Sequence, residues 1–495
     1  MAVAADQTSL PVEPSLDEVR ELAHDYNTIA LRHSFIDDTE TPVSAFLKLR
    51  GREPEFPAFL LESAERGQEV GRYSFIGVRP SSVVRWSLGD EPADPYAFAA
   101  EEVARHRQAP WPDMPPFAGG AVGYFGYDLV RTVEPLGEPN PDPIGLPDMA
   151  LMLSDVLVVF DHLKHTISVL VNVYSEAGNR TLEEAYADAV ATIQKARDLL
   201  AGPVPRREAT PARPRPTFTS NMPREEFEGN VARIVEYIHA GDAFQVVPSQ
   251  RWSADLDIDP FSVYRGLRVV NPSPYMYFLD FMDFQIAGAS PEPVLTVAGR
   301  HVATRPIAGT RPRGATLEED ERIAEELLAD EKECAEHVML VDLGRNDLGR
   351  VCEYGSVSVD RFMAVETYSH VMHIVSNVSG TLREDVAAMD ALRSVLPAGT
   401  LSGAPKVRAM QIIDELETIK RGGYGGAIGY LSYTGDLDTC IHIRTVVIKD
   451  GRAHVQAGGG TVADAKPAYE FDESEAKARA VLRAVELASQ QPDWP

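Results

Sequence analysis

Two segments carry acidic side chains at helical spacing, which places each set on one helix face. They are Glu333, Glu336 and His337 with Leu340, and Glu470 and Glu473 with Lys477. One carboxylate from each helix, meeting across a cleft, could bind Mg²⁺, which takes few protein carboxylates and keeps water or substrate oxygens as its other ligands. A solvated acidic face with a Glu–Lys pair at i, i+4 is the alternative interpretation.

A single carboxyl group stands in the turn GASPEPV (Gly288–Val294), where an apolar strand ends. Pro291 and Pro293 flank Glu292, so the stiff turn could hold this acid partly out of water. Desolvation raises a carboxyl pKa towards the range that suits proton donation. An exposed Glu in a surface turn is the alternative.

Glycine-rich and arginine-rich segments offer contacts for an anion. TRPIAGTRPRG (Thr304–Gly314) presents hydroxyl and guanidinium groups, and AGGGT (Ala457–Thr461) presents backbone amides that a ligand can approach closely. AGGGT lacks the spacing and trailing Lys of a phosphate-binding loop. HVMHIVS (His370–Ser376) alternates like a strand, so its two histidines point to opposite faces and one of them can face a site. A basic loop, a plain turn and surface histidines are the respective alternatives.

The C-terminal part of the chain gathers polar segments that together could enclose one small anion. They are PAGTLSGAPK (Pro397–Lys406), GAIGY (Gly426–Tyr430), IHIRT (Ile441–Thr445), AGGGT and FDESEAK (Phe471–Lys477). Their hydroxyls, amides, cations and carboxylates suit a dicarboxylate together with a divalent cation. The residues themselves therefore predict an enzyme with an anion and Mg²⁺ site.

Four regions follow from composition and periodicity. We expect a flexible leader (1–16), a mixed helix–strand region (17–200), a Pro/Arg-rich connector (201–217) and a second mixed region (218–490). Helices are expected at 182–200, from about 223 to 240, at 317–343 and at 469–488, and strands at 151–160, 166–173, 244–252, 276–281, 284–289 and 294–298. Strands outnumber the intervening helices, so we predict an α+β fold of layered, largely antiparallel sheets flanked by helices.

Composition excludes several functional classes. A net charge of −28 opposes binding to nucleic acid, which requires clustered Lys and Arg. No apolar run reaches the length of a membrane span, and the N-terminus lacks the pattern of a secretory signal. Cys334, Cys352 and Cys440 form no CxxC pair or disulfide framework, which suits the reducing cytoplasm.

Taken together, the motifs resemble the chorismate-utilising enzymes, and among them the anthranilate synthase component I group. The matching segments are FQVVPSQR, NPSPYMYF, GASPE, RPIAGTR, KECAEH, VDLGRNDLGR, GTLSGAPK and FDESEAKARAV, with weaker matches at LLES (Leu60–Ser63) and GGAVGYFGYD (Gly119–Asp128). The resemblance is strong over about 218–487 and implies Mg²⁺-dependent amination of chorismate at C2, loss of the C4 hydroxyl, and elimination of pyruvate to give anthranilate, the first step of tryptophan biosynthesis.

The resemblance also implies roles for single residues. Glu292 is the acid for the departing hydroxyl, His373 assists pyruvate elimination, and Glu336 and Glu473 bind Mg²⁺. The expected substrate contacts are Thr310, Thr400, Tyr430, Arg444, Lys477 and the amides of Gly458, Gly459 and Gly460. Ser63, Pro274, Tyr275 and Met276 match the group's tryptophan feedback site, where aromatic and thioether groups suit an indole; core packing is the alternative.

Two positions distinguish reactions within the family. Relatives that add water carry a Lys base where this chain has Gln245, and ammonia needs no such base once it arrives unprotonated. Aminodeoxychorismate synthases read PIKGT with a Lys nucleophile at the position of Ala308, and an alanine cannot form that covalent adduct. Both positions favour direct amination.

Partners and rival functions complete the expectations. The chain shows no glutaminase nucleophile, so the resemblance implies a separate glutamine amidotransferase subunit that supplies ammonia, in an oligomer with this chain. One alternative is a 2-amino-4-deoxyisochorismate synthase, which retains the enolpyruvyl group. The other is a catalytically silent tryptophan-binding regulator.

Overall fold

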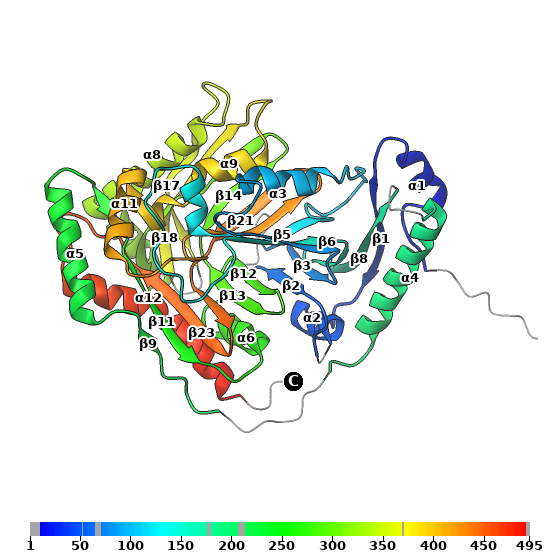
Figure 1. The fold of residues 1–495 in the computed structure, drawn as a ribbon, viewed down its shortest axis with the longest axis horizontal. Coiled ribbons are helices and arrows are strands. Elements are labelled where there is room, and N and C mark those ends of the chain that lie inside the picture. The colour runs from blue at the N-terminus through cyan, green and yellow to red at the C-terminus, as the bar shows by residue number, and fades with distance from the viewer. Residues whose placement is uncertain are drawn as a thin grey trace, which may run out of the picture.

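The structure, a computed structural model, describes residues 10–51, 53–64, 71–175, 180–205, 213–368 and 371–491. Two large β-sheets dominate these residues and helices flank them (Figure 1). Every ladder between the named strands of the described residues is antiparallel. The predicted α+β fold with layered antiparallel sheets is confirmed.

The first sheet has eleven strands in the described part of the chain. In spatial order they are β1 (Thr28–Ile36), β8 (Thr166–Tyr174), β7 (Val156–Asp161), β3 (Tyr73–Val78), β2 (Ala58–Glu62), β12 (Tyr275–Asp280), β13 (Phe284–Ser290), β22 (Thr445–Lys449), β23 (Arg452–Gly458), β11 (Ser249–Asp255) and β9 (Thr219–Ser220).

The second sheet has ten strands among the same described ranges. In order they are β16 (Ile307–Pro312), β18 (Val371–Thr381), β15 (His301–Thr304), β14 (Pro293–Ala298), β21 (Leu437–Ile441), β20 (Ala427–Ser432), β5 (Gly120–Phe125), β6 (Met149–Ser154) and β4 (Ser82–Trp86), with β17 (Ser358–Thr367) paired to β18. A short separate ladder joins β10 (Gln245–Val246) to β19 (Gly403–Ala404).

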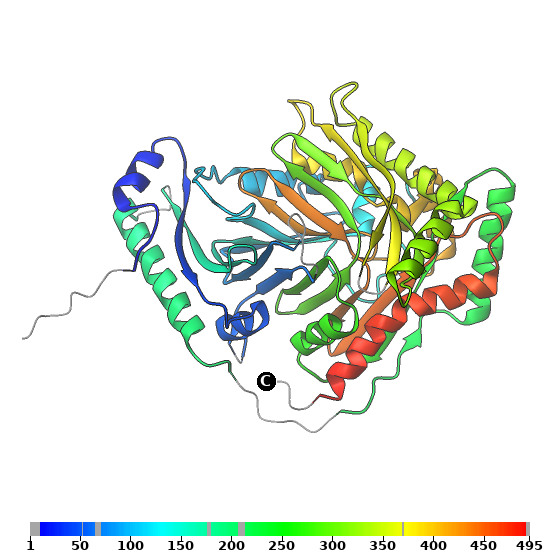
Figure 2. The ribbon, with the colours of Figure 1, turned by 180° about the vertical axis from the view of Figure 1, so that it is seen from behind.

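Helices cover the outer faces of both sheets. Their bounds are α1 (Leu16–Leu22), α2 (Pro42–Arg50), α3 (Pro95–Ala104), α4 (Leu182–Ala201), α5 (Arg224–His239), α6 (Pro260–Val270), α7 (Leu317–Ala329), α8 (Glu331–Gly349), α9 (Ala388–Val395), α10 (Gly399–Ser402), α11 (Lys406–Leu416), α12 (Pro467–Ser489) and the 3₁₀ turn η1 (Tyr127–Thr132). Figure 2 shows the long C-terminal α12, which packs on α5, α6 and β23.

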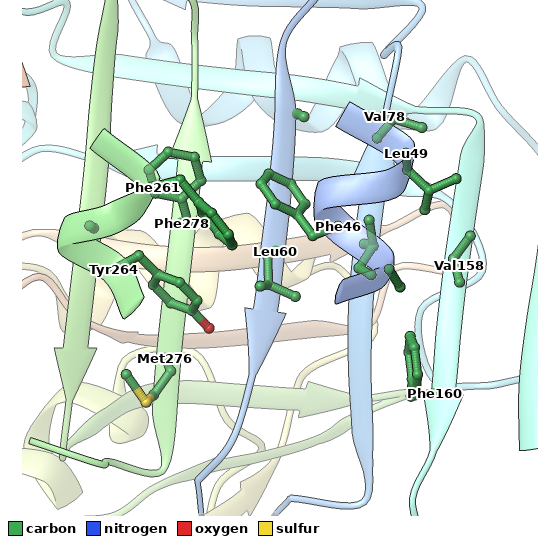
Figure 3. Close-up of a cluster of buried hydrophobic side chains, with 14 of the residues drawn as sticks. Phe46, Leu49, Leu60, Val78, Val158, Phe160, Phe261, Tyr264, Met276 and Phe278 are labelled. Atoms are coloured by element: carbon green, nitrogen blue, oxygen red, sulfur yellow. The ribbon is translucent and has the colours of Figure 1, made fainter. Parts of the chain in front are cut away.

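Three apolar layers hold the arrangement together. One lies between the sheets and contains residues of both, such as Tyr277 and Ile428. A second lies under α3, α8 and α9 on the outer face of the second sheet. The third lies outside the first sheet, where the tilted rings of Phe46 of α2 and Phe261 of α6 lie 4.7 Å apart between centroids and pack on Phe278 of β12 (Figure 3).

The two mixed regions on either side of the connector share both sheets. In the first sheet β2 from the N-terminal region pairs with β12, and in the second sheet β5 pairs with β20. Leader residues 10–15 contact β1, since the Glu13 amide donates to the Arg32 carbonyl at 2.9 Å. The leader's first nine residues lie outside the described ranges.

Three predicted elements are each two elements in the structure. The helix expected at 317–343 divides at Asp330, whose side chain accepts hydrogen bonds from the Lys332 and Glu333 amides and so caps α8. The strand expected at 151–160 divides into β6 and β7, which belong to different sheets. The strand expected at 244–252 divides before Pro248, which has no backbone N–H to donate.

Candidate active site

A cavity of about 420 Å³ brings together side chains from widely separated segments. Of the residues predicted for catalysis and substrate binding, it is lined by Gln245, Glu292, Thr310, Glu336, His373, Thr400, Arg444, Gly458, Gly460, Glu473 and Lys477. We call this space the substrate cavity. The sequence motifs therefore converge on one site. Glu292 is not exposed, so the surface-turn alternative is wrong for it, whereas the Glu473–Lys477 pair of the helix-face alternative is present at 2.9 Å.

Glu292 occupies the short turn between β13 of one sheet and β14 of the other. Its carbonyl accepts a hydrogen bond from the Ile441 amide at 2.9 Å, which fixes the turn. The Thr400 hydroxyl donates to Glu292 Oε1 at 3.1 Å. Burial raises the pKa of Glu292 to about 8, although the Thr400 hydrogen bond and the charge of Lys477 oppose the rise. At neutral pH this side chain is a protonated acid.

Gln245 and Glu336 form a second pair on the cavity wall. Gln245 Nε2 donates to Glu336 Oε1 at 3.0 Å, while Gln245 Oε1 is buried without a hydrogen-bond partner. Burial raises the pKa of Glu336, and the neighbouring Glu333 and Glu473 charges act in the same direction. A bound cation next to Glu336 would therefore be strongly favoured by these carboxylates.

The first turns of α12 bring two acids and a cation into the cavity. Lys477 Nζ lies 2.9 Å from Glu473 Oε1 and donates to the Gly458 carbonyl at 3.1 Å. Burial, and then the charge of Glu473, raise the pKa of Glu470 to about 7. Arg444 is anchored by a hydrogen bond from Nη1 to the Lys477 carbonyl at 2.5 Å. Two cations thus lie beside a group of carboxylates.

His373 of β18 is held against the neighbouring strand β16. Its Nδ1 lies 2.9 Å from the Gly309 carbonyl oxygen and 3.1 Å from Thr310 Oγ1. Because a carbonyl only accepts hydrogen bonds, Nδ1 carries the proton and Nε2 keeps its lone pair. Burial lowers the pKa of His373, so its imidazole is a neutral base. His370, its predicted opposite, lies outside the described residues.

The AGGGT glycines pack too closely for side chains. A Cβ on Gly460 would lie 2.4 Å from Gln245 Nε2, and one on Gly458 would lie 2.1 Å from the Pro248 carbonyl oxygen. Gly459 is not part of the cavity lining; a Cβ there would lie 3.2 Å from an oxygen of both Glu470 and Glu473. The segment therefore closes the cavity with backbone alone.

The donor set fits Mg²⁺ bound by few protein ligands. Among the described residues, no three His, Cys, Asp or Glu side chains are grouped closely enough to cage a metal ion. Glu336 and Glu473 nevertheless line the same cavity, and Glu470 Oε2 beside them is buried without a hydrogen-bond partner. Mg²⁺ commonly takes one or two carboxylates and completes its shell with water and substrate oxygens.

The prediction that Tyr430 contacts the substrate is wrong. Its ring lies 4.7 Å from that of Phe117 and 5.9 Å from that of Phe75 between centroids, and it lines a different cavity. Strand β20 pairs with β5 and β21 and directs this side chain into the space between the sheets. Tyr424 lines the substrate cavity instead. The glycines on both sides of it, in GGYGG, were the sequence signal for an unusual backbone at that position.

A second cavity of about 410 Å³ contains the residues predicted to bind tryptophan. Ser63, Pro274, Tyr275 and Met276 all line it, and Phe75 and Tyr430 add aromatic surface. The Tyr275 hydroxyl donates to Asp438 Oδ1 at 3.1 Å, and burial raises the pKa of Asp438 to about 6. We call this space the regulatory cavity, after the role predicted for its residues. It combines an apolar lining with a buried acid.

Known proteins resemble the chain over nearly its whole length. The family model described as chorismate binding enzyme matches residues 56–483. Anthranilate synthase component 1 of Pseudomonas putida is 50% identical over 95% of this chain and 98% of its own length. The crystal structure of anthranilate synthase component I from Streptococcus pneumoniae TIGR4 superposes with a TM-score of 0.76 at 40% identity, covering 90% of this chain and 99% of that one.

A more distant structure shares the fold alone. The menaquinone-specific isochorismate synthase from Escherichia coli superposes with a TM-score of 0.69 at 17% identity, covering 95% of this chain and 98% of that one. This fold is therefore shared with a protein whose name indicates a different activity. From the family match and the close relatives together, the chain belongs to the chorismate binding enzymes.

Proposed function

We propose that the chain is the chorismate-aminating subunit of an anthranilate synthase. The observation that carries this proposal is a protonated acid, Glu292, in one cavity with the Glu336–Glu473 carboxylates and the cations Arg444 and Lys477. The relatives named anthranilate synthase component 1, of which that of Pseudomonas putida is 50% identical, support the same reaction. The Gln at position 245 and the alanine at position 308 favour direct amination over addition of water and over a covalent Lys adduct.

Chorismate carries a ring carboxylate and a carboxylate on its enolpyruvyl ether. Arg444, Tyr424 and the backbone amides near Gly458 and Gly460 suit the enolpyruvyl carboxylate. Glu336 and Glu473 would hold Mg²⁺ against the ring carboxylate, with Lys477 beside it. When bound, this ion offsets the negative charge of the ring carboxylate.

Glu292 acts in the first half-reaction. Ammonia forms a bond to C2, the two ring double bonds shift, and the C4–O bond breaks. Hydroxide is a poor leaving group, so Glu292 donates its proton to the departing oxygen and water forms. The C2 ammonium then loses a proton to solvent. The Ala308 methyl lines the cavity and offers no nucleophile, so ammonia attacks the ring directly.

His373 acts in the second half-reaction. Its Nε2 takes the proton from C2, the C3–O bond breaks, and the enolpyruvyl group leaves to become pyruvate while the ring becomes aromatic. The neutral state of His373, which burial favours, suits this role. Without this step the product would be 2-amino-4-deoxyisochorismate, and the chain would be the alternative synthase.

Ammonia comes from a separate glutamine amidotransferase subunit in this proposal. The cysteines Cys334, Cys352 and Cys440 are free, and burial raises the pKa of the Cys352 and Cys440 thiols, which disfavours a nucleophilic thiolate. Free thiols also suit the cytoplasm, where we place the protein. In the described residues, no helix combines the length and the apolar character needed to cross a bilayer.

Tryptophan is the proposed inhibitor and binds in the regulatory cavity. The cavity has room for an indole between aromatic and thioether surfaces, and Asp438 offers a charge partner for an ammonium group. Strand β12 connects this cavity to the active site, because Tyr275 pairs with Ser290, two residues before Glu292.

The test is to incubate the purified chain with chorismate, Mg²⁺ and an ammonium salt at alkaline pH, where more ammonia is unprotonated, and to separate the products. Anthranilate together with pyruvate is the expected result. An aminated product that retains its enolpyruvyl group would replace the proposal by the aminodeoxyisochorismate synthase. Tryptophan binding without any product, even with the amidotransferase subunit added, would identify a silent regulator.

A further inference from the structure

A small cavity adjoins the substrate cavity at Glu292. Its volume is about 40 Å³, and it shares Glu292, Leu340 and Thr400 with the lining of the substrate cavity. These three residues therefore form the wall between the two spaces. A cavity of about 10–15 Å³ suffices for a water molecule where polar groups can bind it. We call this space the rear cavity.

One face of α8 and one strand exit form the walls of the rear cavity. Leu340, Leu343, Gly344 and Asp347 follow helical spacing along α8. Thr304, Arg305 and Pro306 line the opposite side. The Arg305 side chain is 30% exposed, so the lining extends from the buried acid to a group in contact with solvent.

Asp347 gives the rear cavity a buried acceptor that the proposed chemistry does not use. Its residue is 3% exposed, and its Oδ2 lies 2.7 Å from Lys406 Nζ, which also donates to the Val395 carbonyl at 2.8 Å. Asp347 Oδ1 is buried without a hydrogen-bond partner, a state that costs free energy unless water satisfies it. Lys406 is thus held by the Asp347 carboxylate and the Val395 carbonyl.

The first half-reaction requires a place for the water formed at C4 and a proton for Glu292. The substrate cavity cannot supply either while the ring occupies it. Each turnover consumes the Glu292 proton and produces one water from the C4 oxygen and that proton. The aminated ring still fills the substrate cavity at that moment. The water must move away from C4 to prevent reversal, and the Glu292 carboxylate must regain a proton.

We propose that the rear cavity receives the water formed at C4 and conducts a proton back to Glu292, with Asp347, fixed by Lys406, as the positioning residue that anchors the water. This inference rests on the proposed function. The proton that returns is balanced by the one that the C2 ammonium releases, so no other reactant is required. Residues of VDLGRNDLGR and GTLSGAPK thereby gain a role outside the substrate contacts.

Filling the rear cavity is the first test. In Gly344→Ala the new Cβ would lie 3.2 Å from Thr304 Cγ2 and 3.7 Å from Pro306 Cγ, so it fits with a small adjustment and reduces the space. Alanine also favours the helix, which protects folding. Gly229→Ala is the matched control, because it lies in α5 with open space around it.

Removing the anchor is the second test. Asp347→Asn keeps the side-chain shape and removes the carboxylate. Asp128→Asn is its control: Asp128 is 2% exposed and paired with Arg131 at 2.8 Å, but lies outside both cavities. The control reports what the loss of a buried ion pair does by itself. If Asp347→Asn fails to fold, Gly344→Ala still decides the question.

Both half-reactions are measured for each variant, with chorismate or with purified 2-amino-4-deoxyisochorismate as the substrate. We expect the rear-cavity variants to lower kcat from chorismate about tenfold, a part of what a general acid contributes, with KM unchanged. Elimination from the aminated intermediate should keep the wild-type rate. Equal slowing of both half-reactions, or of neither, would overturn the inference. Failure of the proposed function would show differently, as a wild-type chain that makes no anthranilate.

Discussion

Three glutamates that line the substrate cavity, Glu292, Glu336 and Glu473, have different environments because their immediate partners differ. Glu473 has the Lys477 ammonium at 2.9 Å, whereas Glu292 has only a hydroxyl at 3.1 Å and a distant cation. Burial therefore favours the protonated form of Glu292, whereas Glu473 forms an ion pair with Lys477. Glu336 lies between these cases, with an amide donor but like charges nearby. The environment of each glutamate, rather than its residue type, therefore distinguishes the proposed acid Glu292 from the proposed metal ligands Glu336 and Glu473.

The pH dependence of the first half-reaction should follow Glu292. Its pKa is raised from 4.5 to about 8, so the proton needed for catalysis is present below that pH and lost above it. At a constant concentration of free ammonia, kcat should therefore fall as pH rises through about 8. Glu292→Gln should lower kcat by about 10²–10⁴ and leave little of this pH dependence. Stopped assays from pH 6.5 to 9.5 measure both; a variant with wild-type kcat would exclude Glu292 as the acid.

Glu336 should determine how turnover depends on Mg²⁺. Glu336→Ala removes one carboxylate from the proposed Mg²⁺ site and should abolish turnover at any practicable Mg²⁺ concentration. Tryptophan binding, measured by calorimetry, should persist because the regulatory cavity does not contain this residue. Unchanged turnover in the variant would count against the metal assignment, and loss of tryptophan binding would indicate general unfolding.

Local patterns predicted the acids better than the aromatic contact. Glu292 lies between two prolines at a strand end, and the two acidic faces repeat at helical spacing, so short-range sequence determines where these groups point. The choice between Tyr424 and Tyr430 instead depends on which strands flank β20, a long-range pairing with β5 and β21. The position of Tyr430 in its motif could not show which face of the sheet its side chain occupies.

At the scale of elements, the junction between β23 and α12 aligns both sides of the site. The glycine segment at the end of β23 packs against Gln245 of β10, and α12, which carries the Glu473–Lys477 pair, begins further along the chain at Pro467. The Val246–Thr461 hydrogen bonds at 3.1 and 2.8 Å fix the distance between these elements. The junction therefore sets the spacing between the amide of Gln245 and the carboxylates of α12.

A methyl group at this junction should disable catalysis without unfolding the chain. In Gly460→Ala the Cβ would lie 2.4 Å from Gln245 Nε2 and must displace that amide from Glu336. We expect kcat to fall about a hundredfold, because small displacements of positioned groups are costly. Gly349→Ala, with open space at the end of α8, is the control. Steady-state kinetics together with thermal melting decide: a normal kcat in Gly460→Ala would show that Gln245 tolerates movement.

Element boundaries were predictable where caps and periodicity agree. Helix α12 was expected at 469–488 and runs from Pro467 to Ser489. The break between α7 and α8 was missed because Asp330 caps α8 within a continuous acidic, helix-forming pattern. The break between β6 and β7 was missed because the chain moves from one sheet to the other within an unbroken apolar run, and only the tertiary structure requires that change.

At the scale of the whole molecule, the interleaved sheets place the two large cavities one hairpin apart. Tyr275 on β12 lines the regulatory cavity and pairs with Ser290 on β13. The Glu292 amide donates to Ser290 Oγ at 3.4 Å. We therefore expect a ligand that displaces β12 to displace the turn that holds Glu292 as well. Strand order across 495 residues could not be read from periodicity, so this connection is visible only in the fold.

Filling the regulatory cavity should separate inhibition from catalysis. Ser63→Tyr adds a ring to the cavity wall and should raise the tryptophan concentration for half-inhibition at least about tenfold, which equals about 1.4 kcal/mol of lost binding. Turnover without tryptophan should stay close to that of the wild type, since Ser63 is not part of the substrate cavity lining. Ser82→Tyr, on the exposed edge strand β4, is the control. The measurement is the initial rate at increasing tryptophan concentrations. Inhibition of Ser63→Tyr at wild-type tryptophan concentrations would place the tryptophan site elsewhere. Loss of turnover without tryptophan would mean that the two cavities cannot be altered independently, because the β12–β13 hairpin transmits a change in one cavity to the other.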